Sequence, residues 1–172
     1  MTRTLVGTVC SGRGLARKHL ERHAAELARL LGAPPVPGSL NLVLRWPVGF
    51  DFQECQLAWN DQFFWAGSVA GIPALVYRWL NCPLHVVEIV APVMLRSQLR
   101  VDDGDKVSIS VDGMRTVTFK QYISWSILWD LRQDSFYTSN GPVSRFKQLR
   151  KYATQRSMLP PLPKPAMRPF SF

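Results

Sequence analysis

The sequence predicts a mainly β protein built around a small barrel, because many short strand-like segments are separated by turn residues. These segments are rich in β-branched and aromatic residues, and Gly, Pro and Asp-Gly punctuate them. One substantial helical pattern interrupts them, whereas an α/β sandwich alternates helices with strands throughout. A chain of 172 residues, 47% of them hydrophobic, is long enough for one packed domain with an extension.

The first predicted strand covers residues 4–10 and ends at a Ser-Gly turn. A helix is predicted next, over residues 15–31, because apolar residues repeat at helical spacing along one stripe. Gly32 and the prolines that follow it end this helix. His19 and His23 lie four residues apart on it, and we interpret them as part of a solvated helix face rather than as a metal pair.

The middle of the chain contains the remaining predicted strands and a short helix. The predicted strands are residues 40–46, segments of 62–77 broken at Gly67, Gly71 and Pro73, and residues 86–90 and 106–111. Residues 94–99 are predicted to form one or two helical turns. With the first strand, these segments are sufficient to close a small barrel.

After residue 113 the pattern becomes helical and basic. Tyr122, Trp125, Trp129 and Arg132 are spaced as one helical face, and residues 142–155 are predicted to form a second, basic helix. The proline-rich residues 157–172 are expected to be extended or disordered unless they dock. The sequence therefore divides into a barrel domain, residues 1–113, and a helical extension with a basic tail, residues 114–172.

The formal net charge of +9 favours anionic partners such as nucleotides, nucleic acid or anionic surfaces. No apolar run approaches the roughly 18 residues of a membrane span, and no signal peptide is evident, so we expect a cytoplasmic protein without a membrane partner. The three cysteines are widely spaced and odd in number, which argues against a disulfide framework and a cysteine zinc site.

Candidate functional residues lie in four segments: residues 7–14 (GTVCSGRG), 37–42 (PGSLNL), 88–96 (EIVAPVMLR) and 99–109 (LRVDDGDKVSI). Backbone N–H groups in residues 12–16, at the start of a helix and beside cationic side chains, are suited to phosphate oxygens. Ser39 and Asn41, two apart on an extended segment, offer two neutral oxygens to one side. Glu88 stands in an apolar run, where a carboxylate needs a partner.

In this order the four segments resemble the CTP-dependent riboflavin kinases of archaea, over about residues 4–111. The resemblance implies a closed six-stranded cradle-loop β-barrel with one helix inserted after the first strand. It also implies that Mg²⁺ and CTP bind, and that the γ-phosphoryl group passes to riboflavin. The implied nucleotide-binding residues are Gly12, Arg13, Gly14, Leu15, Ala16, Arg17, Met94, Leu95, Arg96 and Ser97. The implied metal ligands are Ser39 and Asn41, and the implied acceptor-binding residues are Glu88, Leu80 and Asn81.

The sequence departs from that family in its first loop, which lacks a third glycine, and at Leu80, where the family has a threonine. Because of these two differences, we expect the acceptor to be either riboflavin or another small alcohol. The sequence does not identify a general base. Two alternatives stay open: a non-catalytic nucleotide- or flavin-binding module on the same barrel, and a basic nucleic-acid-binding protein. A homodimer is also an open alternative. We further hypothesise that the extension covers the acceptor site.

Overall fold

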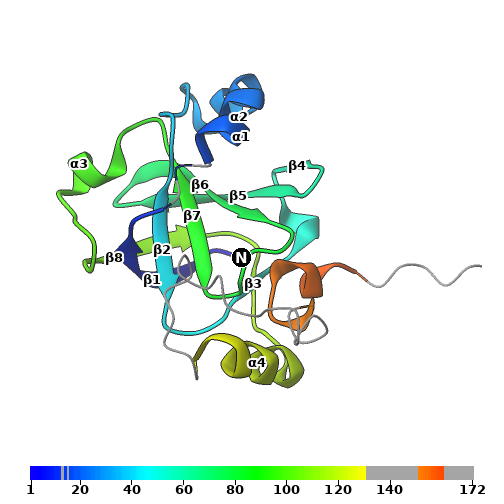
Figure 1. Ribbon diagram of the computed structural model, residues 1–172. Coiled ribbons are helices and arrows are strands. Elements are labelled where there is room, and N and C mark those ends of the chain that lie inside the picture. Colours follow the sequence, from blue (N-terminus) through cyan, green and yellow to red (C-terminus); the bar gives the residue numbers. More distant parts are fainter. Residues whose placement is uncertain (13, 15, 131–150, 161–172) are drawn as a thin grey trace, which may run out of the picture.

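The computed structural model describes residues 1–12, 14, 16–130 and 151–160. Six strands form its barrel: β1 (Arg3–Cys10), β2 (Leu40–Leu44), β5 (Gln62–Val69), β6 (Ile72–Trp79), β7 (Val86–Val90) and β8 (Lys106–Val111). They are antiparallel in the order β5-β6-β7-β2-β1-β8, and β8 pairs again with β5 to close the ring. The predicted mainly β, closed six-stranded barrel is confirmed (Figure 1).

Two short pairings lie outside the ring. Strand β4 (Leu57–Trp59) extends the sheet beyond β5, and β3 (Gly49–Phe50) pairs with β9 (Met114–Arg115). The 3-10 turn η1 (Phe52–Glu54) lies between β3 and β4. In the ring itself, alternate residues face the core, as the two-residue period of a strand requires. In β8, for example, Val107 and Ile109 are buried while Lys106 and Ser108 are exposed.

The ring closes where β5 meets β8, at Gly67. A Cβ on this residue would lie 2.6 Å from the Ser110 carbonyl oxygen, so the approach of the two strands requires glycine. The predicted strand breaks at Gly67 and Pro73 are therefore wrong, because β5 and β6 run through both positions. The chain turns at Gly71, as predicted, where φ is +79°.

The predicted helix over residues 15–31 is two helices, α1 (Ala16–Arg22) and α2 (Ala24–Leu31). The break falls at His23, whose φ of −120° and ψ of 20° are not helical. The solvated-face interpretation is wrong for His23, which is buried with its ring 5.3 Å from that of Trp59. The break changes the direction of the chain, and apolar residues of both helices pack on the outer wall of β5, β6 and β7. In Figure 1 both helices lie at one end of the barrel.

The predicted helical turns after residue 94 are confirmed as α3 (Leu95–Leu99). In the extension, α4 (Phe119–Trp125) begins with a capping box formed by Thr118 and Gln121, and it continues as the π-helical turn η2 (Ser126–Asp130). Of the residues predicted to share one helical face, Tyr122 and Trp125 lie on α4 and Trp129 lies on η2. Arg132 lies outside the described residues. Figure 1 places α4 at the end of the barrel opposite α1 and α2.

Most of the predicted second helix, residues 142–155, lies outside the described residues, as does the tail beyond residue 160. Residues 151–152 are helical, but η4 (Gln155–Met158) is a 3-10 turn, so the predicted helix does not extend to residue 155. The backbone of this segment bonds to the connection between β6 and β7: Gln155 N–H donates to the Cys82 carbonyl at 2.9 Å, and Arg156 N–H to that of Leu80 at 2.8 Å.

A buried arginine holds the same segment to the barrel. The Arg78 guanidinium is fully buried and donates hydrogen bonds to the Val48 carbonyl (2.8 Å), the Leu84 carbonyl (3.0 Å) and Gln155 Oε1 (3.1 Å). Gln155 Nε2 in turn donates to the Phe50 carbonyl at 2.9 Å. Burial lowers the pKa of Arg78 to about 10. The extension is thus packed on the barrel through a polar network, while the division of the chain at residue 113 stays a prediction.

We expect Gln155→Ala to destabilise the protein by roughly 2–4 kcal/mol, because it removes two buried hydrogen bonds and leaves a cavity. Urea unfolding followed by circular dichroism measures this loss. Gln53→Ala, at an exposed position in η1, is the matched control and should change the free energy of unfolding by less than about 0.5 kcal/mol. Equal unfolding midpoints for the two variants would show that the network does not stabilise the fold.

Candidate functional site

The register of four strands aligns one row of side chains on the outer wall of the barrel. Cys10 pairs with Asn41, Asn41 with Glu88, and Glu88 with Tyr77. Directly paired residues of antiparallel strands project from the same face of the sheet. The adjacent row, Val9, Leu42 and Val87, is part of the barrel core, so the first row faces outward.

Helices α1 and α2 cover one part of this row. Phe64 and Tyr77 lie under the helices in an apolar cluster that includes Leu20 and Leu27, and the two aromatic rings stack at 4.9 Å. Beyond Tyr77 the row becomes polar, with Glu88, Asn41 and Cys10 in succession. The barrel wall therefore changes from a packing surface to a polar cluster.

Ser39 and Glu88 form a hydrogen-bonded pair within the cluster. Ser39 Oγ donates to Glu88 Oε2 at 2.6 Å, and Glu88 is only 8% exposed. Burial raises the pKa of Glu88, and the bond from Ser39 opposes that effect. The hydroxyl thus orients a carboxylate that holds its proton more readily than a solvated glutamate does.

The loop after β1 lies directly over Asn41. A Cβ on Gly12 would overlap the Asn41 side-chain amide, so a larger residue at position 12 would displace that amide from its present position. Asn41 itself is buried. The contact brings the first segment of the sequence motif, residues 7–14, onto the second, residues 37–42.

An ion pair fixes the start of this loop. Arg96 Nη2 lies 2.6 Å from Asp103 Oδ1 and donates a 3.0 Å hydrogen bond to the Cys10 carbonyl. Asp103 Oδ2 accepts from Ser11 twice, from its hydroxyl at 2.5 Å and its backbone N–H at 3.0 Å. These bonds from Ser11 and Arg96 lower the pKa of Asp103. We call Arg96, Asp103 and Ser11 the loop clamp.

The structure brings together Gly12, Ser39, Asn41 and Glu88, with Arg96 holding the loop beside them. Three other predicted nucleotide-binding residues, Gly14, Met94 and Ser97, are exposed, and so is Arg17, which pairs with Glu21 at 2.9 Å. Ala16, the first residue of α1, packs in the apolar cluster between the helices and the barrel wall, and Leu95 packs in the barrel core. Arg13 and Leu15 lie outside the described residues. The roles assigned to these residues stay predictions.

The predicted acceptor residues fall into two places. Glu88 belongs to the polar cluster, whereas Leu80 and Asn81 follow β6 in its connection to β7. Leu80 is buried in the barrel core and Asn81 is exposed. The described part of the extension contacts Trp46, Phe50, Leu84 and His85, and its Arg156 N–H donates to the Leu80 carbonyl. That the extension covers the acceptor site stays a hypothesis.

Sequence reasoning missed the partners that fix the loop. Neither Asp103 nor Ser11 is assigned a role from the sequence. Both residues occur within the motif segments: Ser11 directly follows β1, and Asp103 shortly precedes β8. Because β1 and β8 are adjacent and antiparallel, the end of one lies beside the start of the other. That proximity was the available signal.

Oxygen atoms of Ser39, Asn41 and Glu88 are the donor type that Mg²⁺ prefers. Within residues 1–12, 14, 16–130 and 151–160, no group of three or more His, Cys, Asp or Glu side chains could enclose a metal ion. Mg²⁺ commonly takes most of its ligands from phosphates and water, so the Ser39 and Asn41 oxygens are the protein groups that would hold it here.

The fold and the cluster together define a class: small antiparallel barrels with a glycine-bearing loop laid over polar side chains on the outer wall. The family model described as CTP-dep_RFKase, Domain of unknown function DUF120, matches residues 9–111. The chain belongs to this CTP-dependent riboflavin kinase family.

Individual relatives agree with this assignment. A riboflavin kinase of Pyrococcus abyssi is 31% identical over 123 residues, which cover 62% of this chain and 58% of that protein. A riboflavin kinase of Ignicoccus hospitalis is 29% identical over 126 residues, or 63% of this chain and 70% of that protein. One of Thermococcus kodakarensis is 27% identical over 123 residues and is matched over 58% of its length. The chain thus spans less than two thirds of two of these proteins.

We expect Glu88→Gln to raise the melting temperature of the unliganded protein at neutral pH. The pKa of Glu88 is raised in the folded state, so the carboxyl contributes stability when protonated and loses that contribution as the pH rises through the folded pKa. The gain from Gln should therefore be small below the ordinary value of 4.5 and larger at neutral pH. Scanning calorimetry at both pH values measures the difference.

Glu26→Gln, on the exposed face of α2, is the control and should leave the pH dependence unchanged. A Glu88→Gln variant that follows the wild-type pH profile would contradict the burial argument.

Proposed function

We propose that the chain binds CTP with Mg²⁺ and transfers the γ-phosphoryl group to a hydroxyl of riboflavin or of another small alcohol. The observation that supports this most directly is the contact of the Gly12 loop with Asn41, beside the Ser39–Glu88 pair, in a member of this family. The loop is the candidate phosphate site, and the pair is the candidate reaction centre.

The triphosphate would bind along the loop that precedes α1. Phosphate oxygens are recognised by backbone N–H groups and cations. The loop would offer both where it leads into Ala16 and Arg17, with Arg17 exchanging its exposed partner Glu21 for a phosphate. The loop clamp supports this assignment, because it holds the first residues of the loop in place before any ligand arrives. A preformed loop loses less conformational entropy on binding.

Ser39 and Asn41 would hold Mg²⁺, which neutralises charge on the β- and γ-phosphates when bound. The barrel wall keeps both side chains on one side of β2 and its lead-in. Phosphoryl transfer depends mainly on positioning and charge neutralisation, so a sparse set of ligands is sufficient.

Glu88 would orient the acceptor. In the proposed step the acceptor oxygen bonds to the γ-phosphorus, the bond to the bridging oxygen breaks, and CDP leaves. The proton of the acceptor hydroxyl passes to the Glu88 carboxylate, whose raised pKa favours accepting it. Leu80 stands where the family has a threonine, so this chain lacks one hydroxyl that the family has at its acceptor site. The proposal therefore names riboflavin or another small alcohol as the acceptor.

The first test is calorimetric titration of the full chain with CTP, ATP, GTP and UTP, with and without Mg²⁺. The proposal expects selective, magnesium-dependent CTP binding and, with riboflavin present, formation of FMN and CDP. CTP binding without turnover of riboflavin or other alcohols would indicate a binding module. Nucleic-acid binding that weakens steeply with salt, without nucleotide binding, would overturn the kinase proposal. A cytoplasmic location and a homodimer stay predictions.

We expect Ser39→Ala and Asn41→Ala each to lower magnesium-dependent turnover by about 10²-fold, since each removes a side chain that orients charge at the reaction centre. Steady-state rates at several Mg²⁺ concentrations measure the effect, and circular dichroism checks that the variants fold. Ser108→Ala, at an exposed position of β8, is the matched control. Normal turnover in both site variants would refute the metal assignment.

A further inference from the structure

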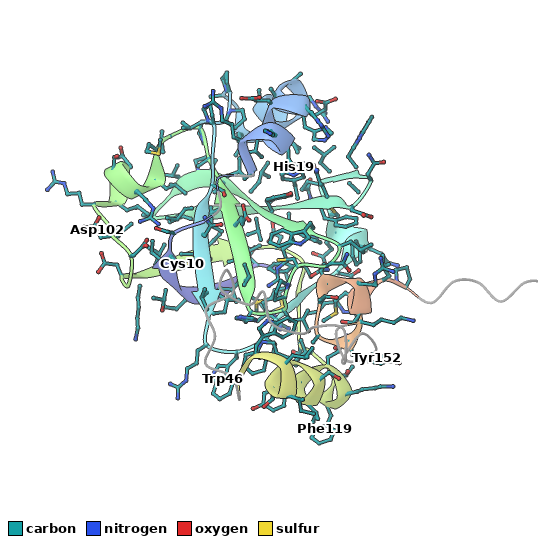
Figure 2. The ribbon with its side chains drawn as sticks, viewed as in Figure 1. Cys10, His19, Trp46, Asp102, Phe119 and Tyr152 are labelled. Carbon is teal, nitrogen blue, oxygen red and sulfur yellow. The ribbon has the colours of Figure 1, made fainter. Side chains whose placement is uncertain are left out.

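The end of the barrel opposite α1 and α2 is built from three segments: residues 45–48, 119–129 and 151–160. Side-chain contacts hold them together: the rings of Trp46 and Tyr122 lie 6.4 Å apart, and Gln121 Nε2 donates to Ser157 Oγ at 2.9 Å. Figure 2 shows Trp46, Phe119 and Tyr152 at this end of the molecule. We call these three segments the basic pole.

An apolar ridge runs along the outside of the basic pole. Phe119, Ile123 and Ile127 are spaced four residues apart and are 81%, 38% and 38% exposed. The opposite face of the same helix is buried on the barrel, through Trp125 and Leu128. A surface helix normally turns polar side chains to solvent, so α4 and η2 have an apolar face that no described residue covers. Trp46, 53% exposed, extends the apolar surface.

Cations occur in the same segments as this ridge. The three segments contain Arg45, Lys120, Lys151 and Arg156 and no aspartate or glutamate, and one acidic residue, Asp130, follows directly at the end of η2. Lys120 Nζ lies 3.9 Å from the centre of the Tyr152 ring, and the Arg45 guanidinium lies 5.3 Å from that of Trp46. A hydrogen bond from Lys120, with the nearby charge of Lys151, lowers the pKa of Tyr152. The ammonium groups therefore gather beside the aromatic side chains.

The sign of this charge selects among possible occupants. A second copy of the chain would place two basic poles against each other across a two-fold axis, which like-charge repulsion disfavours. Residues 161–172 add Lys164 and Arg168 and no acidic residue, so the chain's own tail has the same sign. A surface that combines exposed Phe, Ile and Trp with Lys and Arg matches an interface that is apolar below and anionic above.

We propose that the basic pole binds the surface of an anionic phospholipid bilayer, with the α4 ridge inserted at the boundary of the acyl chains and the cations on lipid phosphates. This is a peripheral contact. No described helix is long and apolar enough to cross a membrane, and a peripheral contact of this kind departs from the sequence-based expectation of no membrane partner. In Figure 2, Cys10, which leads into the glycine loop, lies away from Trp46 and Phe119 in this view.

Flotation of the full-length chain with vesicles tests this proposal. We expect binding to vesicles of phosphatidylcholine mixed with phosphatidylglycerol, weak binding to pure phosphatidylcholine, and release at high salt. The double variant Phe119→Ser with Ile123→Ser should reduce vesicle binding at least about tenfold, and Lys120→Glu by about threefold to tenfold. Both are exposed positions, and thermal unfolding checks the fold of each variant.

Trp59→Ser is the matched control, because Trp59 is 54% exposed but lies on β4 outside the basic pole. Its vesicle binding should equal that of the wild type. Equal binding to both kinds of vesicle, binding to neither, or an equal loss in the Trp59 variant would overturn the proposal. So would a dimer in size-exclusion chromatography with light scattering that the ridge variant dissociates, or an acidic protein bound in place of vesicles. The assay does not depend on kinase activity, so its outcome is independent of the proposed function.

Discussion

The antiparallel register of β1, β2, β7 and β6 decides where the polar residues of this protein lie. Side chains alternate between the two faces of a strand, so a shift of one residue in β2 would move Asn41 into the core and Leu42 to the outer wall. The register is held by the apolar row of Val9, Leu42 and Val87, which is buried only in the observed pairing. The same strand register therefore both packs the core and brings the polar cluster together. The closure of the ring at Gly67 reinforces it, because a closed barrel has no free edge along which the strands could slide.

Two buried charged groups illustrate how the protein uses neutral partners. Glu88 accepts from the Ser39 hydroxyl, and the two terminal nitrogens of Arg78 donate to two backbone carbonyls and the Gln155 amide, while Arg78 Nε is buried without a hydrogen-bond partner. Neither described arrangement is a salt bridge. A carboxylate held by a hydroxyl can exchange that partner for a ligand without leaving an opposite charge behind, whereas three acceptors on three segments fix a guanidinium in place. The first arrangement suits a reacting group, and the second suits a structural one.

The features that could be predicted from the sequence are those that depend on local residue patterns. Strand alternation predicted the barrel, and the motif segments predicted the neighbourhood of Gly12, Ser39, Asn41 and Glu88. The break at His23 was not predictable from the helical stripe, because it depends on the curved wall against which both helices pack. Gly67 was taken for a strand break because the sequence does not reveal how closely β8 approaches. The bond between Arg78 and Gln155 joins residues 77 apart, a separation at which neither spacing nor composition contains information.

That bond also bears on the order in which the protein is made. All six barrel strands have been synthesised once residue 111 is added, yet the amide that completes the environment of Arg78 belongs to residue 155. At roughly 5–20 residues per second, a nascent chain spends several seconds with every strand present and this end of the barrel open. During that interval the guanidinium has water in place of Gln155, and the apolar surface around Leu84 is uncovered. The environment of Arg78 is therefore completed only after residue 155 has been added, well after the last strand of the barrel.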